Sequence, residues 1–497
     1  MSPGRGLSAR MDDWFNPIVV KELRQAVNGK FVSAVLILLL IVQLAALGIF
    51  IVANGDFSND FTAGTTAFMI LEGILLGISL LFVPAYTGIR LAVERSDTNV
   101  DLLFITTLRP IAIVAGKLFS ALVITMLIFS ACMPFMAFTW FLRNIDLPAI
   151  FILLALSFLV VATTIQFTTF IACLPAGRVL KILVALLALG TFPNLFFGTL
   201  TASFWLLQRN VIGGRLGTWD FWGPATAVLL VALAVNGILF ALSVALVTPP
   251  TANRALPVRV LIMAIWLVSL AVTAVISYSF RDIGPLTAWA IISAVVFSAA
   301  ALVAVSERET LGPRVARKIP SGGLPRAAAF VLFSGGANGL VWCALMTALT
   351  FATILLWPSL FNIGTLGRSS DAEVWVAGLF LYFFAYATTA LFIRRTFVSK
   401  WIGHKYTWAI AMLLLAVGCI LPALLSYLLF FDSWRAERHG MWLVGNPFVF
   451  GIQQFQGAYL AFAGAWATIG ALVNLPWFVD QMTRFRPWQS DKAVENE

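Results

Sequence analysis

The sequence predicts an all-α, polytopic membrane protein, a bundle of about 12 transmembrane helices. Of its 497 residues, 61% are hydrophobic and only 11% are charged, whereas a soluble domain carries about 25% charged residues. The apolar residues form runs of about 20, the length of a helix that crosses a hydrocarbon core of about 30 Å. No run alternates apolar and polar residues over about ten positions, which disfavours a transmembrane barrel.

The apolar runs and the basic residues together predict a topology. Of the 32 Lys and Arg residues, 25 lie in or beside segments that are inside when both termini are cytoplasmic, and 7 lie in outside loops. This bias predicts a multi-pass protein of the cytoplasmic (inner) membrane of the cell with its N- and C-termini in the cytoplasm. The predicted spans are 31–53, 66–91, 113–140, 148–174, 179–201, 224–247, 258–280, 286–306, 338–357, 374–394, 407–430 and 454–478.

The polar loops divide the chain into two six-span halves. Ala92-Val93-Glu94-Arg95 and Ser306-Glu307-Arg308 open the largest inside loops, and each loop follows the second span of its half. We therefore expect one half at 31–250, with its polar loop at 92–117, and a second half at 251–497 that is a degenerate repeat of the first. The alternative is chance similarity in a chain rich in Leu and Ala.

Residues 1–30 are predicted to be cytoplasmic and to form a short amphipathic helix before the first span. Asn16 is a good N-cap and Pro17 suits the first helical position. Apolar residues then follow on one face and polar residues on the other, which is typical of a helix lying at the membrane interface. The charged members of this helix are Lys21, Glu22 and Arg24.

The sequence shows no recognisable nucleotide-binding, metal-binding or catalytic motif. Gly116-Lys117 lacks the remainder of a phosphate-binding loop, so the chain is not expected to bind ATP or another cofactor. The four cysteines lie in apolar segments and the two histidines lie in different loops, so no metal site is predicted. Nothing resembles a catalytic set. The chain is predicted not to be an enzyme, and its net charge of +10 is assigned to the inside loops rather than to nucleic-acid binding.

Glu72 is the one clear carboxylate inside a predicted span. Intramembrane ionisable residues are costly and often mark a substrate or ion path. Because Glu72 lies only about two helical turns from the outer end of its span, a structural role near the membrane surface is the alternative. Gly73 and Gly77 beside it favour a helix-packing face.

The polar stretch Glu94–Lys117 reads ERSDTNVDLLFITTLRPIAIVAGK. Its apolar residues recur at helical spacing on one face, and Asp97 and Asp101 suit the positive N-terminus of a helix. Pro110 is predicted to end this helix. We expect a short helix parallel to the membrane on its cytoplasmic side, with a solvated loop as the alternative.

This stretch resembles the cytoplasmic coupling loop of type-2 ABC exporter permeases. That loop commonly reads E-[RK]-x-x-G-T-x-E-x-L-L, followed by T-P-L-S and by G-K at the start of the third span. Asp97 stands in place of the glycine, Asp101 in place of the second Glu, and Thr107-Leu108-Arg109-Pro110 in place of T-P-L-S. The N-terminal helix from Asn16 to Arg24 also resembles that of the family. The matching residues are Glu94, Arg95, Thr98, Leu102, Leu103, Gly116 and Lys117.

The resemblance implies a permease subunit that exports a substrate when a separate cytoplasmic P-loop ATPase subunit binds and hydrolyses ATP. The coupling residues would be those of the stretch, including Arg109 and Pro110, together with the N-terminal helix. Membrane lipid, a second permease or a second copy of the chain are further expected partners. Two alternatives remain: a secondary transporter driven by an ion gradient, and a membrane scaffold without transport activity.

Overall fold

The computed structural model describes residues 17–53, 62–94, 109–142, 145–174, 186, 189–208, 212, 216–249, 251–361, 371–401, 403–430, 440–449 and 455–487. Every regular element in these ranges is a helix, which confirms the predicted all-α class. Eleven of the described helices are long and apolar enough to cross a membrane. The chain is therefore a multi-pass membrane protein, and it divides into two compact units, Met1–Pro249 and Pro250–Glu497.

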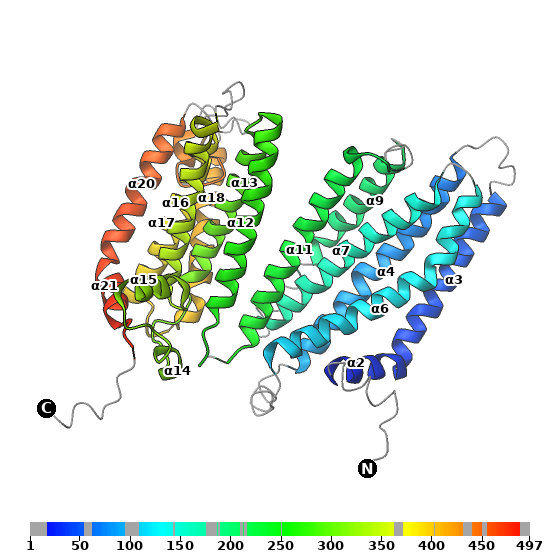
Figure 1. Ribbon diagram of the computed structural model, residues 1–497, viewed down its shortest axis with the longest axis horizontal. Coiled ribbons are helices and arrows are strands. Elements are labelled where there is room, and N and C mark those ends of the chain that lie inside the picture. The colour runs from blue at the N-terminus through cyan, green and yellow to red at the C-terminus, as the bar shows by residue number, and fades with distance from the viewer. Residues whose placement is uncertain are drawn as a thin grey trace, which may run out of the picture. The chain divides into compact units, whose positions relative to one another are not determined.

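Unit 1 is built around α4 (Figure 1). This helix packs against α3, α6, α7 and α9, and its side chains Phe68, Leu71, Leu75 and Leu76 are almost completely buried. A short 3-10 helix, η1, extends the end of α6. The elements are α2 (Pro17–Asn28), α3 (Lys30–Ala53), α4 (Ala63–Glu94), α6 (Pro110–Phe138), η1 (Thr139–Leu142), α7 (Leu147–Cys173), α9 (Phe192–Gln208) and α11 (Trp219–Val247).

The fifth predicted span, 179–201, corresponds to α9. This helix has 17 residues and ends at Gln208 rather than at Thr201. At 1.5 Å per residue it is about 25 Å long, shorter than a hydrocarbon core of about 30 Å. Residues 179–185, the first part of the predicted span, lie outside the described residues.

Unit 2 holds six of the eleven helices that are long enough to cross a membrane, and it carries additional short helices at its span ends (Figure 1). Its central spans are α13 and α17, which pack against each other. The elements are α12 (Ala255–Phe280), α13 (Gly284–Ala304), α14 (Pro313–Ala316), α15 (Gly323–Leu332), α16 (Gly336–Phe361), α17 (Asp371–Thr396), η2 (His404–Tyr406), α18 (Thr407–Phe430), η3 (Gly440–Leu443), α20 (Gln456–Val473) and α21 (Leu475–Arg484).

The last predicted span, 454–478, is too long at its C-terminal end. Helix α20 ends at Val473, and α21 begins as a separate amphipathic helix at Leu475. Between them the side-chain amide of Asn474 donates to the carbonyl oxygens of Thr388, at 3.0 Å, and Gly470, at 2.8 Å. Pro476 has no backbone N–H with which to continue α20, so the chain breaks and starts a new helix.

The two units share one pattern of helix pairing. In each unit the second span packs against the first, third, fourth and fifth, and the fourth span packs against the third, fifth and sixth. Each unit also seats a short helix on its first and third spans: α2 on α3 and α6 in unit 1, and α15 on α12 and α16 in unit 2. The short helix precedes the first span in unit 1 but the third span in unit 2.

None of the four cysteines forms a disulfide in the structure. Cys132, Cys173 and Cys343 are buried within spans and Cys419 is half-buried. They pack as small apolar side chains, as their positions in apolar runs predict.

Candidate functional site

The N-terminal helix α2 is joined to unit 1 by both apolar contacts and charge. Val19 and Ala26 are buried on one face of the helix, while Lys21 and Arg24 are exposed on the other. Glu22 lies with the buried residues and is only 7% exposed. A carboxylate on the buried face of an interface helix needs charged or hydrogen-bonding partners, since leaving it unpaired costs several kcal/mol.

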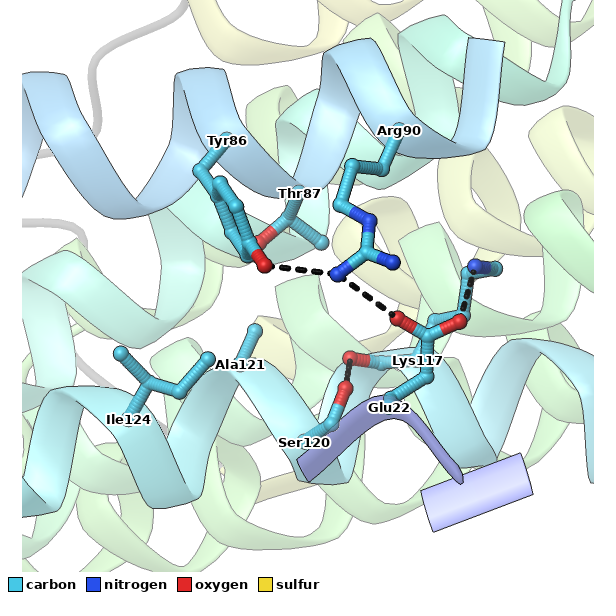
Figure 2. Close-up of a pocket in the computed structure, with 8 residues that line it drawn as sticks. All are labelled: Glu22, Tyr86, Thr87, Arg90, Lys117, Ser120, Ala121 and Ile124. Carbon is cyan, nitrogen blue, oxygen red and sulfur yellow. Dashed lines mark hydrogen bonds and ion pairs between the residues drawn. The ribbon is translucent and has the colours of Figure 1, made fainter. Parts of the chain in front are cut away.

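Two basic side chains from two different spans supply those partners (Figure 2). Lys117 of α6 places its Nζ 2.8 Å from Glu22 Oε1. Arg90 of α4 places its Nη1 3.6 Å from Glu22 Oε2. Each oxygen of the carboxylate therefore faces a different span, and Glu22 ties α2 to α4 and α6 at once.

Arg90 is held in place by further contacts. Its Nη1 donates to the Tyr86 hydroxyl at 2.6 Å, and its Nη2 donates to the side-chain oxygen of Gln25 on α2. The guanidinium carbon lies 5.3 Å from the centre of the Tyr86 ring, within the range of a cation–π contact. Planar, multiply bonded arginine contacts of this kind hold a fixed geometry better than a lysine does.

A small cavity of about 10 Å³ lies within this network. It has room for about one water molecule and is too small for a transported molecule. Its lining comes from α2, α4 and α6: Glu22, Tyr86, Thr87, Arg90, Lys117, Ser120, Ala121 and Ile124. The network is thus suited to fixing three helices relative to one another, not to binding a substrate.

The structure describes only the two ends of the predicted coupling stretch. Glu94 is the last residue of α4, and Arg109, exposed and extended, is the N-cap of α6. Pro110 begins α6 at a position where its missing N–H costs no helical hydrogen bond. Gly116 and Lys117 are buried within that helix, and Lys117 faces Glu22 instead of solvent. The remaining predicted members, Arg95, Asp97, Thr98, Asp101, Leu102 and Leu103, lie outside the described residues, as does the helix expected there.

The predicted N-terminal helix residues are divided between its two faces. Pro17 is the first residue of α2, and Asn16 lies outside the described residues. Lys21 and Arg24 are exposed at the surface, whereas Glu22 is buried and pairs with Lys117. The sequence reasoning missed Arg90 and Tyr86. Their i, i+4 spacing at one end of a span is a signal that could have identified them.

Glu72 lies far from this network, in the interior of unit 1. It is 0% exposed, and its Oε1 accepts hydrogen bonds from Ser157 of α7 at 2.7 Å and Ser203 of α9 at 2.9 Å. The structure therefore brings Glu72 together with two hydroxyl groups that the sequence reasoning did not single out. Within the described residues no group of His, Cys, Asp and Glu side chains could hold a metal ion.

No protein-family model, curated protein or solved structure matches the chain.

Proposed function

We propose that this chain is the membrane permease subunit of an ABC transporter, which exports a substrate across the cytoplasmic membrane when a separate ATPase subunit drives it. The observation that carries the proposal is the attachment of Glu22 to both Arg90 and Lys117. Arg90 and Lys117 belong to α4 and α6, the two spans that border residues 95–108, the stretch that resembles a coupling loop.

The proposal gives this attachment a mechanical role. A partner that docks on residues 95–108 and on the exposed side of α2 would displace α2, α4 and α6 together, because Glu22 joins all three. Helices that are fixed to one another move as a rigid group, and such movement is a common way of transmitting a conformational change. Because α4 contacts four of the other five spans, its displacement would reach most of unit 1.

The proposal is tested by purifying the tagged full-length chain from membranes of its own source cells. We expect a P-loop ATPase subunit to co-purify and the complex to hydrolyse ATP. Changing Asp101→Ala together with Leu103→Ala should abolish co-purification while the bundle still folds. The matched control is Asp146→Asn, which removes an exposed carboxylate at the N-cap of α7.

Two outcomes contradict the proposal. One is a purified chain that brings down no ATPase under conditions in which it remains folded. The other is unchanged co-purification with the double variant, which would show that the 95–108 stretch is not the docking surface.

The second candidate is a secondary transporter, and the buried Glu72 favours it. A carboxyl group inside a span is typical of ion-coupled carriers. This candidate predicts transport in sealed vesicles that contain the chain alone, driven by an ion gradient and independent of ATP. Such transport, lost on Glu72→Gln, would replace the ABC proposal.

A further inference from the structure

Three helices of unit 1 bring polar side chains to one buried point. Glu72 and Ser157 are 0% exposed and Ser203 is 3% exposed. Both serine hydroxyls donate to Glu72 Oε1. Glu72 Oε2 is also buried, and it has no hydrogen-bond partner among the described residues.

The hydrogen-bonding capacity of this cluster is unbalanced. A serine hydroxyl has one proton to donate and two lone pairs with which to accept. Both protons are already directed at Glu72 Oε1, so the cluster offers acceptors: Glu72 Oε2 and the lone pairs of the two serine oxygens. Leaving a buried polar atom without a partner costs about 1–3 kcal/mol, and more for a charged group. A ligand that donates several hydrogen bonds would remove this cost.

We propose that Glu72, Ser157 and Ser203 bind the primary ammonium group of a lipophilic amine. An ammonium group carries three N–H donors and no acceptor, which matches three acceptor oxygens. The neighbouring side chains on α4 are apolar and buried, including Phe68, Leu71 and Leu75, so the remainder of the ligand is an apolar chain. That this amine is the exported substrate rests on the proposed function.

The position of the cluster suits a site at the far side of the membrane from α2. Glu72 is 9 residues after Ala63, the first residue of α4, and Arg90 is 18 residues further on. At 1.5 Å per residue, the cluster lies about 27 Å along α4 from the Glu22 network. One helix therefore carries the proposed coupling network near one end and the amine site near the other.

Helix α9 closes this site in the present structure. It packs against α4 and α7 and carries Ser203. Gly73 and Gly77 of α4 face α9: a Cβ added at Gly73 would lie 3.7 Å from Leu200, and one added at Gly77 would lie 3.7 Å from Phe196, both at ordinary van der Waals contact. Separation of α9 from α4 is the movement that would admit a ligand.

The test uses the purified full-length chain in nanodiscs of neutral phosphatidylcholine. The probes are dodecylamine, dodecanol and dodecanoate, which share a chain length and differ in the head group. We expect dodecylamine to raise the thermal unfolding midpoint more than the other two at equal bilayer concentration. Glu72→Gln keeps the shape of the side chain but replaces an acceptor with a donor. It should weaken the apparent affinity for dodecylamine about tenfold or more, the effect expected from losing a hydrogen bond to a charged group.

A second variant and a control distinguish loss of the binding site from misfolding of the chain. Ser203→Ala removes one hydroxyl with little change in volume and should also weaken dodecylamine binding, whereas Asp146→Asn, exposed at the start of α7, should leave it unchanged. Equal stabilisation by the three probes would overturn the proposal, since it would indicate partition into the bilayer only. Unchanged dodecylamine affinity in both site variants would also overturn it.

This outcome is separable from that of the proposed function because no ATPase is present in the assay. Loss of the amine effect alongside a co-purifying ATPase would reject the site and keep the permease. Amine binding in a chain that never brings down an ATPase would keep the site and reject the permease.

Discussion

In each unit a short helix packs against the first and third spans, but the charged contacts that hold this helix differ between the units. In unit 1 the helix itself carries the buried charge, because Glu22 of α2 faces Lys117 and Arg90. In unit 2 the charges lie on a span and on the segment that follows α13. Arg259 of α12 donates two hydrogen bonds to Glu307, each 2.7 Å, and two more to the carbonyl oxygens of Val331 and Phe333 at the end of α15. Equivalent helix positions therefore do not require equivalent ion pairs.

In unit 2, Glu307 also joins the two ends of the loop between α13 and α16. Glu307 follows α13, and its Oε2 accepts from the backbone N–H of Gly335, just before α16, at 2.7 Å. The segment between the second and third spans is thus fixed at both ends by one carboxylate. Beside it Arg394 of α17 pairs with Glu309. We infer that this loop is a rigid platform; the corresponding segment of unit 1, residues 95–108, lies outside the described residues.

The interiors of the units differ as well. Glu72 is buried in unit 1, whereas the buried polar residues of the described part of unit 2 include no carboxylate. Among the polar contacts of unit 2, two tyrosines hold a loop. The hydroxyls of Tyr382 and Tyr386 donate to the carbonyl oxygens of Val444 and Gly445. The described part of unit 2 therefore has no buried carboxylate that corresponds to Glu72 of the proposed amine site.

The largest effect is expected from Arg259→Met. The arginine side chain is 4% exposed and that of Glu307 is 27% exposed. The change removes the charged partner of Glu307 and the side-chain donor of two carbonyl oxygens, while the backbone N–H of Gly335 still donates to Glu307. Removing one partner of a buried pair costs about 3–5 kcal/mol, so the unfolding midpoint should fall and proteolysis within residues 307–335 should accelerate. The exposed Arg317→Met is the control. Unchanged proteolysis would show that the ion pair does not fix this loop.

The second effect is expected from Glu22→Gln in unit 1. The change removes the carboxylate that lies 2.8 Å from Lys117, whose side chain is only 5% exposed, and should destabilise the attachment of α2 by about 3 kcal/mol. In a complex with the ATPase, ATP hydrolysis should continue while its coupling to transport falls. Lys21→Gln, exposed on the same helix, is the control. If Glu22→Lys with Lys117→Glu restores coupling, the pair itself is responsible; full coupling in Glu22→Gln would contradict the mechanical role.

A smaller effect is expected from Tyr386→Phe. It removes one hydrogen bond of 2.7 Å to the carbonyl oxygen of Gly445 and should cost about 1 kcal/mol. The measurement is hydrogen exchange at the backbone amides of residues 443–446, which should quicken while those of α15 do not change. Equal exchange in the variant and the parent protein would mean that this hydroxyl does not hold the loop.

The smallest effect is expected from Asp480→Ala in α21. Asp480 and Arg484 form an i, i+4 pair at 2.8 Å, with side chains 44% and 64% exposed. Solvent-exposed helical pairs contribute about 0.3–0.5 kcal/mol, so the unfolding midpoint should hardly move. A loss as large as that of Arg259→Met would show that exposure does not rank these pairs.

The fold class followed from the sequence because lipid restricts the choice of structure. Runs of apolar residues predicted the spans, and the eleven helices long enough to cross a membrane confirm the class. Local chemistry could also have placed the end of the last span, since Asn474 and Pro476 form a typical break. This break lies within an otherwise apolar run, so the hydropathy pattern alone does not show it.

The site could not be predicted in the same way because its contacts are distant in sequence. Glu22 and Lys117 are separated by 95 positions, and Ser203 lies 131 positions from Glu72. Periodicity identifies which face of a helix is buried, but it does not identify the residue on another helix that faces it. Arg259 illustrates the limit: it falls in an apolar run, and only the packing of α12 on α13 and α15 gives it Glu307 as a partner.

The burial of the cysteines makes this protein convenient for spectroscopy. Three native thiols are enclosed within spans and the fourth is half-covered, so maleimide labels would react first with cysteines introduced at the surface. Arg24 on α2 and Arg109 before α6 are exposed positions for such a pair. Spin or fluorescent labels at these two positions would report the separation of α2 from the start of α6 when the proposed ATPase partner and ATP are added, with the native thiols left in place.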